Sequence, residues 1–255
     1  MKKTISFMLL FVLLLLTSCS SDTSLKDIRK REVLRVGIKV DVPLFGYLDS
    51  ETNEIDGMEI DLAKALAKEI LGDENAISLV AVTAKTRGPL LANGGIDVIM
   101  ATFTITEERK ESYHFSDPYY VDEIGLLVLK DSSIRTIADM EGKTVGVAQS
   151  GTARAALESH AQEMNLNIQY KEYANYPEIK AELLLGKVDA LSVDKSILRG
   201  YIDDQTVLLD DGFNPQEYGI ATKLENKNLA KCVDDFVRKI KENGQLDAIV
   251  AKWGV

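Results

Sequence analysis

The sequence contains few cysteines and few histidines. Two of its 255 residues are cysteine and two are histidine. His114 and His160 are far apart in the chain, and neither stands in a pattern of cysteines or carboxylates that is typical of metal ligands. We therefore expect no metal site and no bound cofactor.

The chain also lacks an apolar run long enough to cross a bilayer, which needs about 20 residues. Its run from Phe7 to Leu16 has ten residues and follows Lys2 and Lys3, a pattern typical of a secretory signal peptide. We therefore expect the mature protein to lie outside the cytoplasm.

The end of this run, Leu16-Thr-Ser-Cys19, resembles the bacterial lipobox, in which the cysteine becomes the lipid-bearing N-terminus after cleavage. It predicts a lipoprotein signal peptide over 1–18, a lipid anchor at Cys19 and a tether over 19–30. The alternative is an ordinary signal peptide with an incidental cysteine. If Cys19 carries lipid, Cys232 has no partner for an intramolecular disulfide, and its apolar helical neighbourhood predicts a packing role.

An excess of basic residues is absent. Forty aspartates and glutamates outweigh 30 lysines and arginines, so the formal net charge is −10, and loss of Lys2 and Lys3 with the signal would make it more negative. This balance argues against nucleic acid or an anionic membrane surface as a partner.

Apolar strands alternate with amphipathic helices along the rest of the chain, which predicts an α/β fold with largely parallel sheets. The clearest helix, 58–71, has apolar residues at helical spacing and ends at Gly72. The alternation starts again after 130 and shifts near 213. We therefore expect a monomer with one lobe over 31–129 plus 215–255, a second over 130–214, and a two-stranded hinge beside a cleft.

The stretch from Ala101 to Arg109 joins a buried strand to a helix. It places hydroxyls at Thr102, Thr104 and Thr106, and Thr106 followed by two glutamates is typical of a helix start. Hydroxyls, free N–H groups and a guanidinium together suit a carboxylate ligand. The alternative is an ordinary corner with a surface arginine.

Seven segments in order resemble a known family over essentially the whole mature chain. They are 34–38, 57–63, 104–109, 115–120, 146–152, 188–194 and 252–254. The resemblance is to the bacterial extracellular solute-binding proteins of family 3, which bind polar amino acids for ABC importers. It implies a type II periplasmic-binding-protein fold, mixed sheets flanked by helices, that closes on one amino acid and delivers it to a membrane permease.

The resemblance also implies roles for matching residues. Arg109, with donors from Thr104 and the Thr152 loop, would hold the α-carboxylate. Asp194, the Thr104 hydroxyl and the Thr102 carbonyl would hold the α-ammonium. Pairing of both charges makes chemical sense, because an unpaired buried charge is costly. For Asp194 the alternative is an aspartate that caps the following helix.

Two further cations predict the side chain of the ligand. Lys39 stands where many family members that bind basic or amide side chains carry an acid, and the segment around Arg87 resembles the acidic-amino-acid branch. With hydroxyls from Tyr176 and Thr102, these cations predict aspartate or glutamate. A solvated Lys39 and a helix-start Arg87 are the alternatives, and cysteine or glutamine remain open as ligands.

A catalytic role is the competing class of function. A few relatives with this fold are dehydratases, which need a positioned general acid. The predicted site contains no histidine and no paired carboxylates. We therefore expect a binding protein rather than an enzyme.

Overall fold

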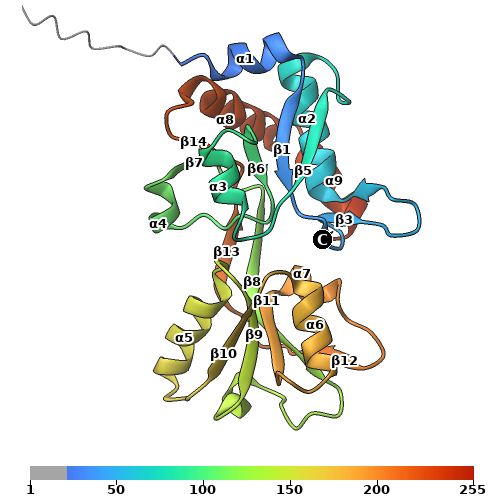
Figure 1. Cartoon of the computed structure of the whole chain (residues 1–255), viewed down its shortest axis with the longest axis vertical. Coiled ribbons are helices and arrows are strands. Elements are labelled where there is room, and N and C mark those ends of the chain that lie inside the picture. The colour runs from blue at the N-terminus through green and yellow to red at the C-terminus, as the bar shows by residue number, and fades with distance from the viewer. Residues whose placement is uncertain (1–21) are drawn as a thin grey trace, which may run out of the picture.

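The structure is a computed structural model that describes residues 22–255, so the expected signal peptide and Cys19 lie outside the described residues. Two α/β lobes are stacked along the longest axis of the molecule (Figure 1). From residue 24 onward the chain forms the start of the first lobe, then the second lobe, and returns to the first with its C-terminal helices.

The first lobe contains a five-stranded sheet. Its strands, in sheet order, are β5 (Ile77–Ala81), β1 (Leu34–Ile38), β6 (Val98–Met100), β14 (Ala221–Lys223) and β7 (Tyr113–Phe115). β1 is parallel to β5 and β6, whereas β14 is antiparallel to β6 and β7. The helices of this lobe are α1 (Ser24–Arg31), α2 (Met58–Leu71), α3 (Arg87–Ala92), α4 (Glu107–Lys110), α8 (Lys227–Glu242) and α9 (Gln245–Trp253).

Helix α2 forms where the sequence predicts it, because its apolar residues recur at helical spacing. Ile60, Ala63, Ala67 and Ile70 are buried in the core of the first lobe. The helix ends at Gly72, whose φ of 81° is a left-handed conformation that glycine adopts without steric cost.

The second lobe contains a mixed sheet. Its strands are β10 (Gln169–Tyr173), β9 (Thr144–Ala148), β11 (Ala190–Asp194), β8 (Tyr120–Leu129) and β12 (Thr206–Leu208), with β13 (Phe213–Tyr218) also paired to β8. β9 is parallel to β10 and β11, and β8 is antiparallel to its partners. Helices α5 (Ala153–Glu163), α6 (Tyr176–Leu184) and α7 (Lys195–Arg199) and a 3₁₀ turn (Ile137–Met140) complete the lobe.

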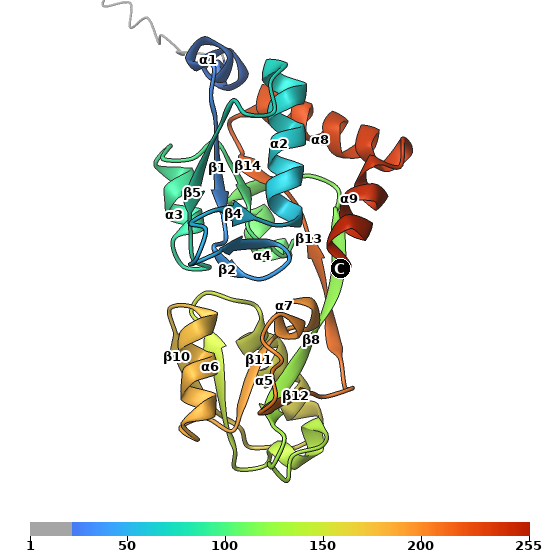
Figure 2. The same ribbon diagram turned by 90° about the vertical axis from the view of Figure 1, so that its right-hand side faces the viewer.

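Strands β8 and β13 form the connection between the lobes and run side by side as an antiparallel pair (Figure 2). The half of β8 from 124 to 129 hydrogen-bonds with β11 and β12 of the second sheet. The sequence placed the lobe boundary at 129, whereas the strand pairing places 124–129 in the second sheet. The ten-residue strand β8 belongs to both the hinge and the second sheet. We propose that the first lobe ends near 119 and resumes near 219.

The segment 217–222 is divided between the lobes. Its first part belongs to β13, which faces 120–124 of β8, and its second part is β14 of the first sheet. The strand is interrupted at Gly219, because the chain leaves the hinge pair there and enters the first sheet.

The expected tether over 19–30 is wrong for its second half. Residues 24–31 form helix α1, which packs against α8 and buries Ile28. The polar composition of this segment conceals one apolar anchor, and burial of that side chain holds the helix on the lobe. Short strands β2 (Asp41–Val42), β3 (Gly46–Leu48) and β4 (Ile55–Asp56) form a small sheet between β1 and α2.

Candidate functional site between the lobes

A small cavity lies between the lobes, beyond the carboxyl ends of β6 and β11. Its volume is about 20 Å³, enough for about one water molecule. Six of the eight predicted ligand-binding residues line it: Arg87, Thr102, Thr104, Thr152, Tyr176 and Asp194. The structure therefore brings together side chains that are up to 107 positions apart, between Arg87 and Asp194.

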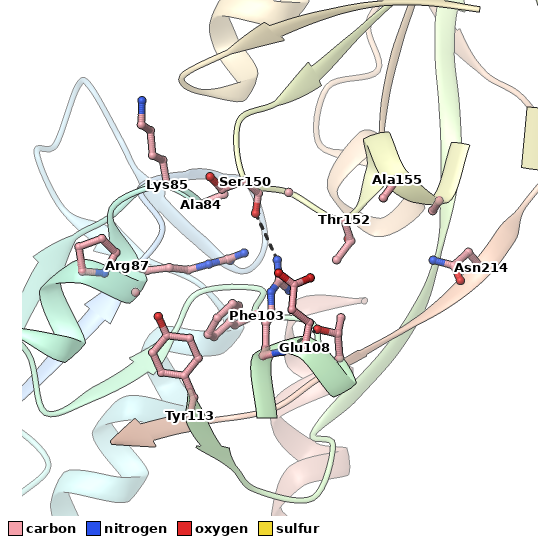
Figure 3. A pocket seen from close by; sticks show the side chains of 16 residues that line it. Ala84, Lys85, Arg87, Phe103, Glu108, Tyr113, Ser150, Thr152, Ala155 and Asn214 are labelled. Atoms are coloured by element: carbon pink, nitrogen blue, oxygen red, sulfur yellow. Dashed lines mark hydrogen bonds between the residues drawn. The ribbon is translucent and has the colours of Figure 1, made fainter. Parts of the chain in front are cut away.

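A larger groove of about 620 Å³ lies beside this cavity and shares Arg87 and Thr152 with it. Arg109, the seventh predicted residue, lines the groove. Figure 3 shows the Arg87 side chain extended toward the middle of the groove, with Phe103 close to its end. The Phe103 ring stacks against both guanidinium groups, at 4.2 Å from Arg87 and 4.6 Å from Arg109. An aromatic face thus supports both cations.

The turn after β6 has a constrained backbone at Thr102. Thr102 has a φ of 44°, which is costly for a residue with a branched side chain. Its backbone N–H donates to Oε1 of the buried Glu59 at 2.6 Å. Farther along, the Thr106 hydroxyl accepts from the Arg109 N–H at 3.1 Å and caps α4, as the sequence predicted.

Arg109 joins the two lobes. Its Nη1 donates to the Thr104 carbonyl oxygen at 2.7 Å, and its Nη2 donates to the Ser150 carbonyl oxygen of the second lobe at 3.2 Å, drawn as the dashed line in Figure 3. Burial, and secondarily the neighbouring Arg87, lowers the pKa of Arg109 to about 9. The guanidinium therefore stays charged at neutral pH.

Asp194 ends β11 and is buried. Its Oδ2 accepts a hydrogen bond from the Tyr218 hydroxyl, and its side chain makes no cap to helix α7. The alternative of a capping aspartate is therefore wrong. Burial raises the pKa of Asp194 to about 7. Among residues 22–255 this carboxylate has no cationic partner within salt-bridge distance, and it suits a cation supplied by a ligand.

Lys39 does not reach the small cavity, but it lies next to a residue that does. It is 1% exposed, its Nζ lies 3.0 Å from Asp41 Oδ1, and the same Nζ lies 4.9 Å from the centre of the Tyr176 ring. Burial lowers the pKa of Lys39, and Asp41 opposes this effect. The alternative of a solvated surface lysine is wrong.

Arg87 is the first residue of α3 and is also buried. Its Nη1 donates to the carbonyl oxygens of Ala101 at 2.5 Å and Thr102 at 3.2 Å. Burial lowers the pKa of Arg87, and the charge of Glu59 partly offsets that effect. Arg87 thus combines the helix-start position with a place at the cavity wall.

The cations of the site are matched by acids. Lys39, Arg87 and Arg109 face the carboxyl groups of Asp41, Glu59 and Asp194, so the formal charges cancel when all six groups are ionised. A zwitterion with a neutral side chain preserves this balance, whereas a side-chain carboxylate adds one negative charge. The arrangement can therefore hold a small zwitterion whose two charges meet Arg109 and Asp194.

Five contributing residues were not predicted from the sequence: Asp41, Glu59, Phe103, Gln216 and Tyr218. Gln216 accepts the hydroxyl hydrogen bonds of both Thr104 and Thr152. Glu59 carried a detectable signal, because it continues the buried face of α2 formed by Leu62, Ala63, Leu66 and Ile70. A carboxylate in phase with a buried stripe indicates a buried polar contact.

The described residues show neither a metal site nor a membrane span. No group of histidine, cysteine and carboxylate side chains within 22–255 is arranged to hold a metal ion. Over that range, no helix combines the length and apolar character that crossing a membrane requires. Cys232 is half-buried against the core of the first lobe.

Known proteins resemble this chain over nearly its whole length. The model of the bacterial extracellular solute-binding proteins, family 3, matches residues 34–255. A glutamine-binding protein of Geobacillus stearothermophilus is 44% identical over 220 residues, covering 85% of this chain and 82% of that protein. The ABC transporter glutamine-binding protein GlnH of Bacillus subtilis is 37% identical over 270 residues, covering 99% and 97%.

A solved structure shares the architecture. The crystal structure of a cysteine-binding protein from Campylobacter jejuni has a TM-score of 0.82 and 31% identity, and covers 90% of this chain and 92% of that one. This similarity confirms the predicted two-lobed periplasmic-binding-protein fold.

Proposed function

The chain belongs to the bacterial extracellular solute-binding proteins, family 3, and on this premise we propose that it captures L-glutamine and delivers it to an ABC permease. The coarser part of the sequence prediction is confirmed: the chain is an amino-acid-binding protein that works with an ABC transporter outside the cytoplasm. The expected preference for aspartate or glutamate fits less well, because both relatives are named for glutamine.

Lys39 and Asp41 carry the proposal for an amide ligand. An amide offers one acceptor oxygen and a donor NH₂ group, so a matching site needs a donor and an acceptor side by side. The Lys39 ammonium and the Asp41 carboxylate, 3.0 Å apart, supply both. Asp41 Oδ1 accepts no hydrogen bond from the described residues beyond this ion pair. In our proposal the amide oxygen faces Lys39 and the NH₂ group faces Asp41.

The α-groups of the ligand take the positions that the sequence predicted. We assign the α-carboxylate to Arg109, whose planar guanidinium matches two oxygens, together with N–H groups at the start of α5. The α-ammonium is assigned to Asp194, the Thr104 hydroxyl oxygen and the Thr102 carbonyl oxygen. Tyr176 supplies a hydroxyl, and Arg87 lies behind the Thr102 carbonyl.

Binding requires the lobes to move. A cavity of about 20 Å³ is too small for an amino acid, so we infer that the ligand enters while the lobes are farther apart. Contacts from both lobes then favour a closed state around the ligand, by the difference between its affinities for the two states. The hinge pair β8 and β13 is the element that would bend.

A second ligand class is favoured by one observation. Lys39 and Arg87 are both buried beside the cavity, and two cations beyond Arg109 would stabilise a side-chain carboxylate. If Glu59 binds a proton, which burial promotes by raising its pKa, the site gains a positive charge. Aspartate and glutamate are therefore the second candidates, and the cysteine-binding relative makes cysteine worth including in any screen.

A thermal-shift screen of residues 22–255 against the common amino acids tests the proposal. A ligand that binds the folded state alone raises stability as RT ln(1 + [L]/Kd). We expect glutamine to give the largest rise in melting temperature. A rise with aspartate and glutamate alone would transfer the function to the second candidates. If no amino acid raises the melting temperature, amino-acid binding is refuted.

We also propose a non-catalytic role, which is supported by the two relatives that are named as binding proteins.

The lipid anchor is a separate proposal, and the segment Leu16-Thr-Ser-Cys19 supports it. Expression of the full chain in a bacterium, followed by detergent phase partition, tests the anchor. We expect the wild-type chain in the detergent phase and Cys19→Ala in the aqueous phase. Wild-type protein in the aqueous phase would contradict lipidation.

A further inference from the structure

One side chain of the hinge receives hydrogen bonds from both lobes. Gln216 lies on β13 and is 1% exposed. Its Oε1 accepts from the Thr104 hydroxyl of the first lobe at 2.9 Å and from the Thr152 hydroxyl of the second lobe at 2.7 Å. Both threonines line the cavity between the lobes.

The orientation of the Gln216 amide is fixed by its other end. Nε2 lies 2.8 Å from the Asn214 carbonyl oxygen and 3.3 Å from the Pro215 carbonyl oxygen. Carbonyl oxygens accept hydrogen bonds and cannot donate them, so the NH₂ group must face them. The amide oxygen must therefore face the two hydroxyls, and each hydroxyl must be the donor.

This orientation determines what each hydroxyl offers to a ligand. A threonine hydroxyl has one proton and two lone pairs. Because both protons are used by Gln216, Thr104 and Thr152 present only lone pairs to the cavity. Such an oxygen can accept a hydrogen bond from an ammonium group, but it cannot donate one to a carboxylate.

We infer that Gln216 is a positioning residue that makes the Thr104 hydroxyl an acceptor for the ligand α-ammonium and removes the Thr152 hydroxyl from the α-carboxylate contacts. This inference rests on the proposed function and adds a determinant of specificity for α-amino acids. The α-carboxylate is then left to Arg109 and to backbone N–H groups of the first turn of α5.

Tyr218, on the same hinge strand, also orients a proposed acceptor of the ammonium group. Tyr218 stands two positions after Gln216, so its side chain leaves the same face of β13. Its hydroxyl donates to Asp194, the other proposed ammonium acceptor. Both acceptor groups are therefore oriented by one strand of the hinge, which links recognition of the ammonium to the element that bends.

Two isosteric variants test the inference by titration calorimetry with L-glutamine. Thr104→Val removes the acceptor of the ammonium, and we expect affinity to fall about ten- to a hundredfold, as for loss of a hydrogen bond to a charged group. Thr152→Val removes a hydroxyl whose one hydrogen bond within residues 22–255 is to Gln216, and we expect a change in affinity below about threefold. A loss for Thr152→Val as large as that for Thr104→Val would overturn the inference.

A double-mutant cycle separates positioning from a merely structural role. Gln216→Met keeps the shape and removes the acceptor, and we expect its loss to overlap with that of Thr104→Val, so that the double variant binds no more weakly than Thr104→Val. If the losses of affinity in the two single variants multiply in the double variant, Gln216 acts independently of Thr104 and the inference is contradicted. Glu217→Met, at an exposed position of the same strand, is the control and should leave affinity unchanged.

The two proposals fail in different ways. If wild-type protein binds no amino acid, the proposed function fails and the inference falls with it. If wild-type protein binds glutamine and the Thr104, Thr152 and Gln216 variants lose affinity equally and additively, only the inference fails. If Gln216→Met does not fold, the comparison of the two threonine variants still decides the outcome.

Discussion

The Lys39 ammonium lies 3.0 Å from the Asp41 carboxylate, and both groups are largely withdrawn from solvent. A lysine in this position would attract a ligand carboxylate if it stood alone. Paired with Asp41, it becomes half of a neutral donor–acceptor pair. The charge of Lys39 alone is thus a poor guide to the ligand, because a residue two positions later cancels it.

Removal of Asp41 should shift specificity toward acids. In Asp41→Asn the Lys39 charge is uncompensated, so we expect the ratio of glutamate affinity to glutamine affinity to rise about tenfold, consistent with the attraction between charges about 4 Å apart at a partly screened site. Competition binding at pH 7.5 measures this ratio. Glu54→Gln makes the same charge change at an exposed position and should leave the ratio unaltered. An unchanged ratio in Asp41→Asn would show that the pair does not contact the side chain.

Arg109 should be required for every amino acid. Its loss leaves the α-carboxylate without its charged partner, at a cost of about 3–5 kcal/mol for a broken buried pair. We expect Arg109→Ala to weaken glutamine binding by at least a hundredfold, and Arg109→Lys to restore it only in part, because lysine lacks the planar fork. Arg154→Ala, at an exposed position of α5, is the control. Binding by Arg109→Ala at wild-type strength would exclude the assigned role.

Glutamine affinity should depend on pH through Asp194. The α-ammonium binds the ionised carboxylate, and the pKa of Asp194 is raised to about 7 by burial. Affinity should therefore weaken as pH falls through 7, by up to about tenfold per unit, as protons compete with the ligand. Asp194→Asn should bind weakly with a flat profile between pH 5 and 8. A wild-type profile that is equally flat would contradict the assignment.

The same carboxylate should destabilise the protein without ligand. A pKa of about 7 in the folded state, above the ordinary value of 3.8 for an aspartate, means that ionised Asp194 disfavours folding above pH 4 and most strongly above pH 7. A shift of this size corresponds to several kcal/mol, about 1.4 kcal/mol per unit. We expect Asp194→Asn to raise the melting temperature at pH 8 by several degrees, with a smaller gain at pH 5. Calorimetry of both proteins checks this, and a lower melting temperature in the variant at pH 8 would contradict it.

Much of the fold was predictable because local patterns and packing agree. Helix 58–71, the cap at Thr106 and most strands follow from spacing and capping chemistry that tertiary contacts reinforce. Helix α1 and the small sheet around Phe45 were missed because few buried side chains hold them, Ile28 in the helix and Val42 and Phe45 at the sheet, and so few apolar residues give no periodic signal.

Six of the eight residues predicted from the sequence line one cavity, but the contacts that link them were not predictable. The family resemblance pointed to Arg109 and Asp194, and the fold places them in two adjoining pockets, Arg109 in the groove and Asp194 in the small cavity. Their partners were not predictable, because Gln216 and Tyr218 reach the site from a strand whose pairing the sequence did not reveal. The expected preference for an acidic ligand fits the glutamine-binding relatives less well. The proposed preference for an amide depends on which carboxylate lies beside each cation.

Parallel titrations of L-glutamine and L-glutamate into residues 22–255 at pH 7.5 test the central claim most directly. The proposed pairing of Arg109 and Asp194 with the α-groups, and of Lys39 with Asp41, predicts that both ligands bind and that glutamine binds at least about tenfold more tightly, which corresponds to about 1.4 kcal/mol. Tighter binding of glutamate would contradict the neutral site and assign Lys39 and Arg87 to a side-chain carboxylate.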